Sequence, residues 1–300
     1  MHLMNHWTLL NAIVYRAARR LKKPYVVCPA GALVIFGRSR ILKKLYNSAV
    51  GFELIRRAHA HIAIATNEID QFANYGVAPD RITTIPNGID PKDYQIFDIA
   101  KFRSRVGLGD APYVLFVGRL NPIKGPDLLL RAFRNVAPVF KEYHLVYAGP
   151  DGGMKASLEE TSAREGLRER VHFIGYVGGA AKAAAYHGAS FVAIPSRQEA
   201  MSIVVLEAGI CGRPVLMTDQ CGFPEVGRVD GGKIVSATEK GIEEGLRDMI
   251  RNERGRDSMG ERMRRHVEKH YLWDVIAQNY NSLFLKVLQN SNTRATHTGG

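Results

Sequence analysis

Short β-branched apolar runs alternate with stretches of helical periodicity along most of the chain, and this alternation restricts the fold more than any other feature. Such runs are typical of parallel strands buried on both faces, and strands that alternate with helices favour a parallel sheet covered by helices on both sides. The second half predicts six strands: Tyr113–Val117, His144–Ala148, Val171–Ile174, Phe191–Ile194, Pro214–Met217 and Lys233–Val235. Six such units indicate a Rossmann-like domain, so the fold class is α/β.

The first third shows the same pattern with fewer strands. Trp7–Lys22 is predicted as a helix, and Asn67 is a plausible N-cap of a second helix that runs to Tyr75. The predicted strands are Tyr25–Cys28, His61–Ala65 and Ile82–Ile85. Three strands are few for a doubly wound sheet, which usually has about five or six, so this domain is predicted to be partial.

A polar connection from Asp90 to Gly109, which carries one short helix at Ile99–Val106, separates the two halves. We therefore place a partial N-terminal Rossmann-like domain at residues 1–95 and a C-terminal Rossmann-like domain at residues 96–270. Residues 271–290 are predicted to continue as a helix that returns to the N-terminal domain. Residues 291–300 are polar and are predicted to be disordered.

The chain is strongly basic, with 41 Lys and Arg against 29 Asp and Glu. The first 95 residues hold 13 of the Lys and Arg residues and 6 of the Asp and Glu residues. Basic clusters favour an anionic membrane surface, nucleic acid or phosphorylated substrates, although a solvated helix face explains any single cluster equally well. No nucleic-acid-binding motif is present, so nucleic acid is not an expected partner. No apolar run approaches the roughly 20 residues that span a membrane, and three scattered cysteines fit a reducing cytoplasm.

Two cations in the loop after the strand Tyr113–Val117 are framed by glycines, at Gly118 and Gly125. Arg119 and Lys124 lie at the carboxyl end of a parallel strand and just before a helix, where open α/β sheets bind ligands. A bidentate guanidinium and a point-charge ammonium suit a pyrophosphate. Spacing alone leaves open a surface loop with two solvated cations.

Two glutamates, Glu199 and Glu207, follow the strand Phe191–Ile194. A helix is predicted to begin near Ala200–Ser202, with Glu199 at its N-terminal end and Glu207 within the helix. Glu207 has apolar neighbours, and a buried carboxylate needs a partner. That partner could be ligand hydroxyls, solvent or a structural Arg.

The order Gly-Arg-x4-Lys-Gly, Phe-x-Gly, Pro-Ser-x-x-Glu-x7-Glu-Ala and Gly-x-Pro-Val resembles glycosyltransferase family 4, the glycosyl transferases group 1, which are retaining enzymes of GT-B fold. The resemblance runs from about Pro24 to Phe284. It implies that Arg119 and Lys124 bind the donor diphosphate, Glu207 the ribose and Glu199 the donor sugar, with Arg119, Lys124 and Glu199 catalytic. The implied donor-binding set is Gly118, Arg119, Lys124, Tyr176, Ser196, Glu199, Ala200, Met201, Ser202, Ile203 and Glu207.

The same resemblance implies transfer of a sugar from a UDP-, GDP- or ADP-sugar, with retention, to a cell-envelope glycan or lipid-linked acceptor. Such an enzyme would be bacterial, would serve polysaccharide or lipopolysaccharide biosynthesis, and would be cytoplasmic or peripheral on the inner membrane. No cofactor and no metal are expected, because Arg and Lys would supply the positive charge. Lys124→Ala and Glu207→Ala are each expected to weaken donor binding strongly while leaving the fold intact.

The chain departs from the family pattern in three places. Ala30 stands where many members have His, and Ala200-Met201-Ser202 stands where Gly-Phe-Gly is common. The strands and glycine-rich loop that open the family's first domain have no counterpart before Met1, which predicts an N-terminally truncated reading of a longer protein. The alternatives are therefore an inactive nucleotide-sugar-binding module or a related GT-B sugar-nucleotide enzyme. A dehydrogenase is disfavoured, because no Gly-x-Gly-x-x-Gly follows a predicted strand.

Overall fold

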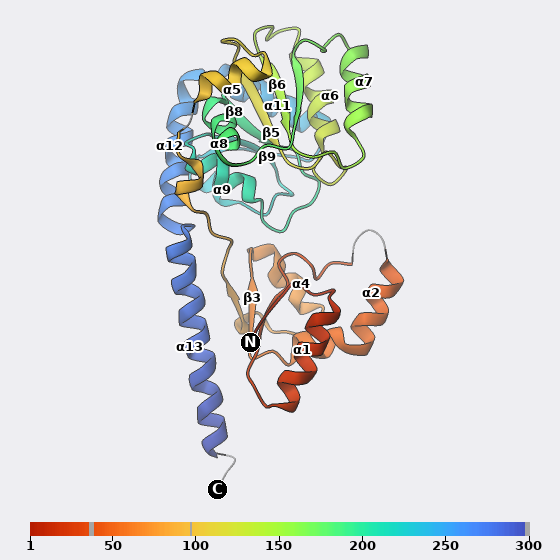
Figure 1. Cartoon of the computed structure of the whole chain (residues 1–300), viewed down its shortest axis with the longest axis vertical. Helices are drawn as coiled ribbons and strands as arrows, with labels where there is room; N and C mark the ends of the chain where they lie inside the picture. Colours follow the sequence, from red (N-terminus) through yellow and green to blue (C-terminus); the bar gives the residue numbers. More distant parts are fainter. Residues whose placement is uncertain (36–38, 97, 298–300) are drawn as a thin grey trace. The chain divides into compact units, whose positions relative to one another are not determined.

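The computed structural model describes residues 1–35, 39–96 and 98–297, and these form two compact units (Figure 1). Unit 1 comprises Met1–Gly88 together with the chain from Trp273 onward, and unit 2 comprises Ile89–Leu272. The sequence placed the first boundary later, after residue 95. The difference arises because the backbone N–H of Ile89 donates to the carbonyl of Tyr271 at 2.8 Å, which ties the start of the connection to unit 2.

Unit 1 is built on a four-stranded parallel sheet in the order β1-β2-β3-β4. The strands are β1 (His2–Met4), β2 (Val26–Cys28), β3 (Ala60–Ala63) and β4 (Ile82–Thr84). The sequence predicted the last three and missed β1. This strand has three residues, of which only Leu3 is buried, so it carries no periodic signal.

The helices of unit 1 are α1 (Leu9–Arg20), α2 (Arg40–Tyr46), α3 (Phe52–Arg56), α4 (Ile69–Ala73) and α13 (Trp273–His297), with a π-helical turn at Asn47–Gly51. Asn67 does not cap a helix, because it lies inside a 3-10 turn, Thr66–Glu68, that precedes α4. Glu68 anchors this turn, since its buried carboxylate accepts from the backbone N–H of Ile64 at 2.6 Å.

The C-terminal helix is longer than the sequence predicted. Residues 291–297, expected to be disordered, continue α13 because the helical backbone pairing runs on past Leu288. The hydroxyl of Ser291 also donates to the carbonyl of Val287 at 2.8 Å. Residues 298–300 of the predicted tail lie outside the described residues.

Unit 2 contains a six-stranded parallel sheet in the order β10-β9-β8-β5-β6-β7. Its strands are β5 (Tyr113–Val117), β6 (His144–Ala148), β7 (Val171–Gly175), β8 (Phe191–Ile194), β9 (Val215–Thr218) and β10 (Gly232–Val235). The predicted α/β class and all six strands are confirmed. The strand order reverses between β5 and β8, and such switch points are where open α/β sheets bind ligands.

Eight described helices flank this sheet: α5 (Ile99–Val106), α6 (Pro126–Val136), α7 (Lys155–Arg164), α8 (Gly179–Gly188), α9 (Ile203–Ile210), α10 (Glu225–Arg228), α11 (Glu239–Arg251) and α12 (Glu253–His270). α6 packs against α11, α5 against α8, and α9 against α12. Leu129, Phe133 and Val136 of α6 are fully buried, so one apolar face of this helix packs into the core. No helix in the described part of the chain is both long and apolar enough to cross a bilayer.

Candidate active site

The loops after β5 and β8 are locked together at the switch point of unit 2. Gly125 has a φ of 66°, and a Cβ there would lie 2.1 Å from the carbonyl oxygen of Pro195, so no larger residue fits. The backbone N–H of Arg197 donates to the carbonyl of Ile123 at 2.7 Å. Two loops far apart in the sequence thus form one rigid platform.

A bidentate ion pair reinforces this platform. The guanidinium of Arg197 donates to both carboxylate oxygens of Asp127 at 2.8 and 2.7 Å. Burial disfavours the charged form of Asp127, but the hydrogen bonds and charges of Arg197 and Arg131 outweigh it and hold the pKa of this carboxyl below its usual value. Asp127, in the first turn of α6, therefore fixes the loop that carries Glu199.

Lys124 and Glu199 meet on this platform. The ammonium of Lys124 lies 3.0 Å from a carboxylate oxygen of Glu199, whose side chain is only 9% exposed. The hydroxyl of Ser196 donates to the other oxygen of the same carboxylate. The side chain of Lys124 is 31% exposed, so this cation keeps a face open to a ligand.

Arg119 occupies the same loop and points to solvent. It follows Gly118, and the backbone there passes so close to β6 that a Cβ on Gly149 would lie 1.9 Å from the carbonyl oxygen of Gly118. The guanidinium of Arg119 has no hydrogen-bond or ion-pair partner among the residues that the structure describes. It is therefore available to an anion.

Helix α9 begins at Ile203, with Ser202 at the N-cap, close to the start that the sequence predicted. The hydroxyl of Ser202 is buried and has no hydrogen-bond partner within the described residues. Buried hydroxyls normally find a partner, and the first turn of a helix also leaves backbone N–H groups free. Ala200 and Met201 lead into this helix, and Met201 is buried. The start of α9 thus offers unsatisfied donors next to Glu199.

Glu207 lies within α9, is 8% exposed, and is held by three side chains of unit 2. One carboxylate oxygen accepts from the hydroxyl of Tyr94 at 2.6 Å and from the ammonium of Lys182 at 2.9 Å. The other accepts from the hydroxyl of Tyr186. The buried carboxylate therefore has hydrogen-bond partners, as its apolar surroundings require. These partners are two tyrosines and a lysine, not solvent or an Arg.

Tyr94, Lys182 and Tyr186 were not found from the sequence. Burial and the Glu207 carboxylate raise the pKa of both tyrosines, so both remain protonated donors. The one available signal was the spacing of Lys182 and Tyr186, four residues apart and therefore on one face of α8. Nothing in the spacing connects either of them to Glu207.

Tyr176, a member of the predicted set, makes no described contact with the Lys124–Glu199 pair. It follows β7, which is separated from β5 by β6, and its side chain is 78% exposed. Its hydroxyl lies against Gly178, where a Cβ would be 3.0 Å away. Its assignment to the donor site stays a prediction.

Comparison with known proteins agrees with this architecture. The family model described as "Glycosyl transferases group 1" matches residues 98–266, and the model described as "Glycosyltransferase Family 4" matches residues 2–93. The chain belongs to the group 1 glycosyl transferases, as the resemblance of its motifs indicated.

Among curated proteins, the chain is 35% identical over 179 residues to the D-inositol 3-phosphate glycosyltransferase of Nocardia farcinica, covering 57% of this chain and 40% of that protein. It is 32% identical over 214 residues to an uncharacterized glycosyltransferase of Methanocaldococcus jannaschii, covering 68% and 54%. The solved structure of Anabaena HepE in complex with UDP aligns with a TM-score of 0.82 at 21% identity, covering 95% and 78%, and shows the same fold. The chain thus spans about half the length of these curated relatives.

Proposed function

We propose that unit 2 binds a nucleoside diphosphate sugar at the β5–β8 switch point and that the chain transfers this sugar to an acceptor with retention. The observation that carries the proposal is the Lys124–Glu199 ion pair, which lies on a platform shared by the two loops. Around it are an unpartnered guanidinium and an unpartnered buried hydroxyl in the described part of unit 2. Cationic side chains with unused N–H donors, close to the start of a helix, suit a diphosphate.

In this proposal, Arg119 and Lys124 stabilise the negative charge that develops on the diphosphate as the bond from the anomeric carbon to the phosphate oxygen breaks. The acceptor hydroxyl attacks from the same face, and its proton passes to the leaving phosphate oxygen. Glu199 orients the sugar and Lys124. No metal is required, because the two cations supply the charge.

Glu207 would bind the ribose. A carboxylate offers about four acceptor positions, and three donors already occupy this one, so one position is open to a ribose hydroxyl. A second ribose hydroxyl would have to displace Tyr94 or Lys182. Lys182 is the more mobile candidate, because its side chain is 25% exposed.

Titration calorimetry with UDP, GDP and ADP, together with a nucleotide-release assay on the matching sugar donors, tests this function. UDP is the first probe, since the HepE structure contains it. We expect one nucleotide to bind in the micromolar range, and transfer to persist in EDTA with the sugar's anomeric configuration retained. No binding of any nucleotide would contradict the proposal, and loss of transfer in EDTA would contradict its metal-free form.

The second candidate is a nucleotide-sugar-binding module that does not transfer sugar. It is favoured by the sheet of unit 1, which has four described strands where a doubly wound sheet usually has about five or six. Binding without nucleotide release, on this chain and with a range of acceptors, is the result expected for this candidate.

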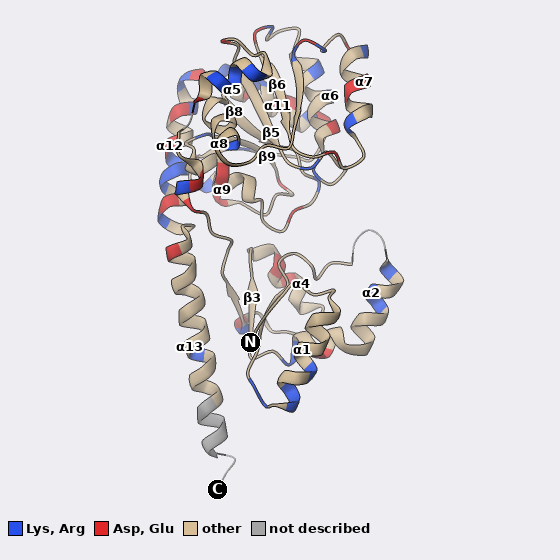
Figure 2. Ribbon diagram, in the orientation of Figure 1, with Lys and Arg blue, Asp and Glu red and all other residues tan. Residues whose placement is uncertain are grey.

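For the acceptor we propose a cell-envelope glycan or a lipid-linked sugar, reached at an anionic membrane surface. Figure 2 shows lysines and arginines along α1 and α2 of unit 1. On α2, Ile41, Leu42 and Leu45 are exposed beside Lys43 and Lys44. Exposed apolar side chains next to cations are typical of helices that lie on anionic lipid.

We expect the chain to co-sediment with vesicles that contain about 30% anionic lipid and to be released as salt is raised, because screening weakens attraction between charges. Ile41→Ser/Leu45→Ser should reduce this binding severalfold. Equal binding to neutral and anionic vesicles would contradict the membrane part of the proposal without affecting donor binding.

A further inference from the structure

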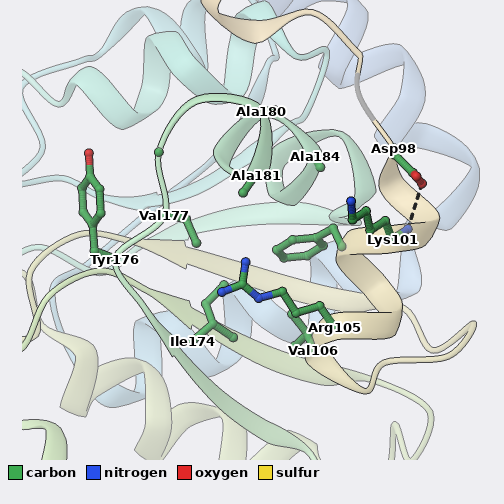
Figure 3. A pocket seen from close by; sticks show the side chains of 12 residues that line it. Asp98, Lys101, Arg105, Val106, Ile174, Tyr176, Val177, Ala180, Ala181 and Ala184 are labelled. Atoms are coloured by element: carbon green, nitrogen blue, oxygen red, sulfur yellow. Dashed lines mark hydrogen bonds between the residues drawn. The ribbon is translucent and has the colours of Figure 1, made fainter.

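A cavity of unit 2 lies between α5, the end of β7 and the start of α8, with a volume of about 530 Å³. Its walls are mostly apolar and include Phe102, Val106, Ile174, Val177, Ala181 and Ala184 (Figure 3). This volume falls in the range of small-molecule sites, which are mainly apolar with a few polar groups that orient the ligand.

The cavity exists because α8 presents only small side chains on this face. Ala180, Ala181 and Ala184 line it, and their spacing places them on one side of the helix. The opposite wall is fixed, since Arg103 of α5 donates to the carbonyls of Gly109 at 2.8 Å and Ala111 at 2.6 Å. The space is therefore formed in advance of any ligand.

Two cations border this apolar space. Lys101 and Arg105 are four residues apart on α5, and both line the cavity. Neither lies within ion-pair distance of a carboxylate belonging to residues 1–35, 39–96 or 98–297. The acidic side chain that lines this cavity, Asp98, caps α5 by accepting from the backbone N–H of Lys101 at 2.8 Å. Figure 3 shows Arg105 extending from α5 toward Ile174, across the apolar floor.

This cavity is separate from the candidate donor site. Lys182 and Tyr186, which bind Glu207, project from the face of α8 opposite to Ala180, Ala181 and Ala184, as the 100° rotation per residue requires. The helix itself therefore stands between the cavity and the Glu207 cluster. Tyr176, at the rim, is the one predicted donor residue that lines this cavity.

We propose that this cavity binds a small organic anion with an apolar body, whose charged group pairs with Lys101 and Arg105, independently of the nucleotide. The apolar walls favour the body, because burying apolar surface drives its transfer from water. The two unpaired cations select for negative charge at the rim. This inference goes beyond the proposed transfer reaction and does not depend on it.

The probe is 8-anilinonaphthalene-1-sulfonate, which combines an aromatic body with one sulfonate, titrated by fluorescence into the full chain. We expect saturable binding to the wild-type chain. Ala181→Phe, which fills the cavity, should lower the affinity for the probe by more than about tenfold, and Lys101→Ala/Arg105→Ala should lower it by about tenfold. The matched control Arg16→Ala/Arg20→Ala removes two cations with the same spacing from α1 and should change nothing. The neutral analogue N-phenyl-1-naphthylamine should lose affinity in Ala181→Phe but keep it in the charge variant.

Excess UDP should leave the bound probe in place, and the methyl resonance of Ile174 should shift on titration of the wild-type chain. Because this shift is measured on the wild-type chain, it tests whether the probe binds in the cavity even if Ala181→Phe fails to fold. Displacement by UDP would overturn the separation of the two sites. Absence of saturable binding, an unchanged Ile174 resonance, or full affinity in a folded Ala181→Phe would overturn the site itself.

Discussion

Glu207→Ala should lower the free energy of unfolding by about 2–4 kcal/mol, because it removes the common partner of three donors. The hydroxyls of Tyr94 and Tyr186 would lose their acceptor inside unit 2, and the ammonium of Lys182 would lose its counter-ion. Urea unfolding followed by far-ultraviolet circular dichroism measures this change. The sequence alone predicted weakened donor binding with the fold intact, and the contacts of Glu207 add to that expectation a loss of stability.

The matched control is Glu159→Ala, which removes an exposed carboxylate whose ion pair with Lys155 is 3.5 Å long. We expect a change below about 0.5 kcal/mol there, as is usual for exposed ion pairs. Adding Lys182→Met to Glu207→Ala should recover part of the lost stability, because the unpaired ammonium is removed as well. Equal stability of Glu207→Ala and the wild type would show that the carboxylate is not held as the structure indicates.

The parallel sheet of unit 2 could be predicted from the sequence because its central strands are buried on both faces and read as largely apolar runs. β5 and β8 show this clearly, since all but the last residue of β5 and all of β8 are buried. The loops after them could then be recognised as ligand loops, because the carboxyl ends of parallel strands share one edge. This topology brings the loops of Lys124 and Glu199 to one edge of the sheet, but the ion pair between the two side chains was not predicted from the sequence.

The surroundings of Glu207 could not be predicted in the same way. Tyr94 lies 113 residues from Glu207 and Lys182 lies 25 residues from it, and no local periodicity links such distant positions. The cavity beside α8 was missed for a related reason. A helix rich in alanine has little contrast between its faces, so the pattern does not reveal which face remains uncovered.

Lys124→Ala should weaken UDP binding about 10- to 100-fold, because a charge-assisted contact contributes about 1.5–3 kcal/mol and each 1.4 kcal/mol is tenfold. The same change leaves the largely buried Glu199 carboxylate with Ser196 alone, so negative charge would also repel the diphosphate. Titration calorimetry measures the affinity, and Lys240→Ala, which removes a lysine that is 87% exposed, is the matched control with no expected effect. Lys124→Arg should restore part of the affinity, since it keeps the charge but not the point-charge geometry. Unchanged affinity in a folded Lys124→Ala would place the diphosphate elsewhere, because no other lysine among the described residues forms an ion pair with Glu199.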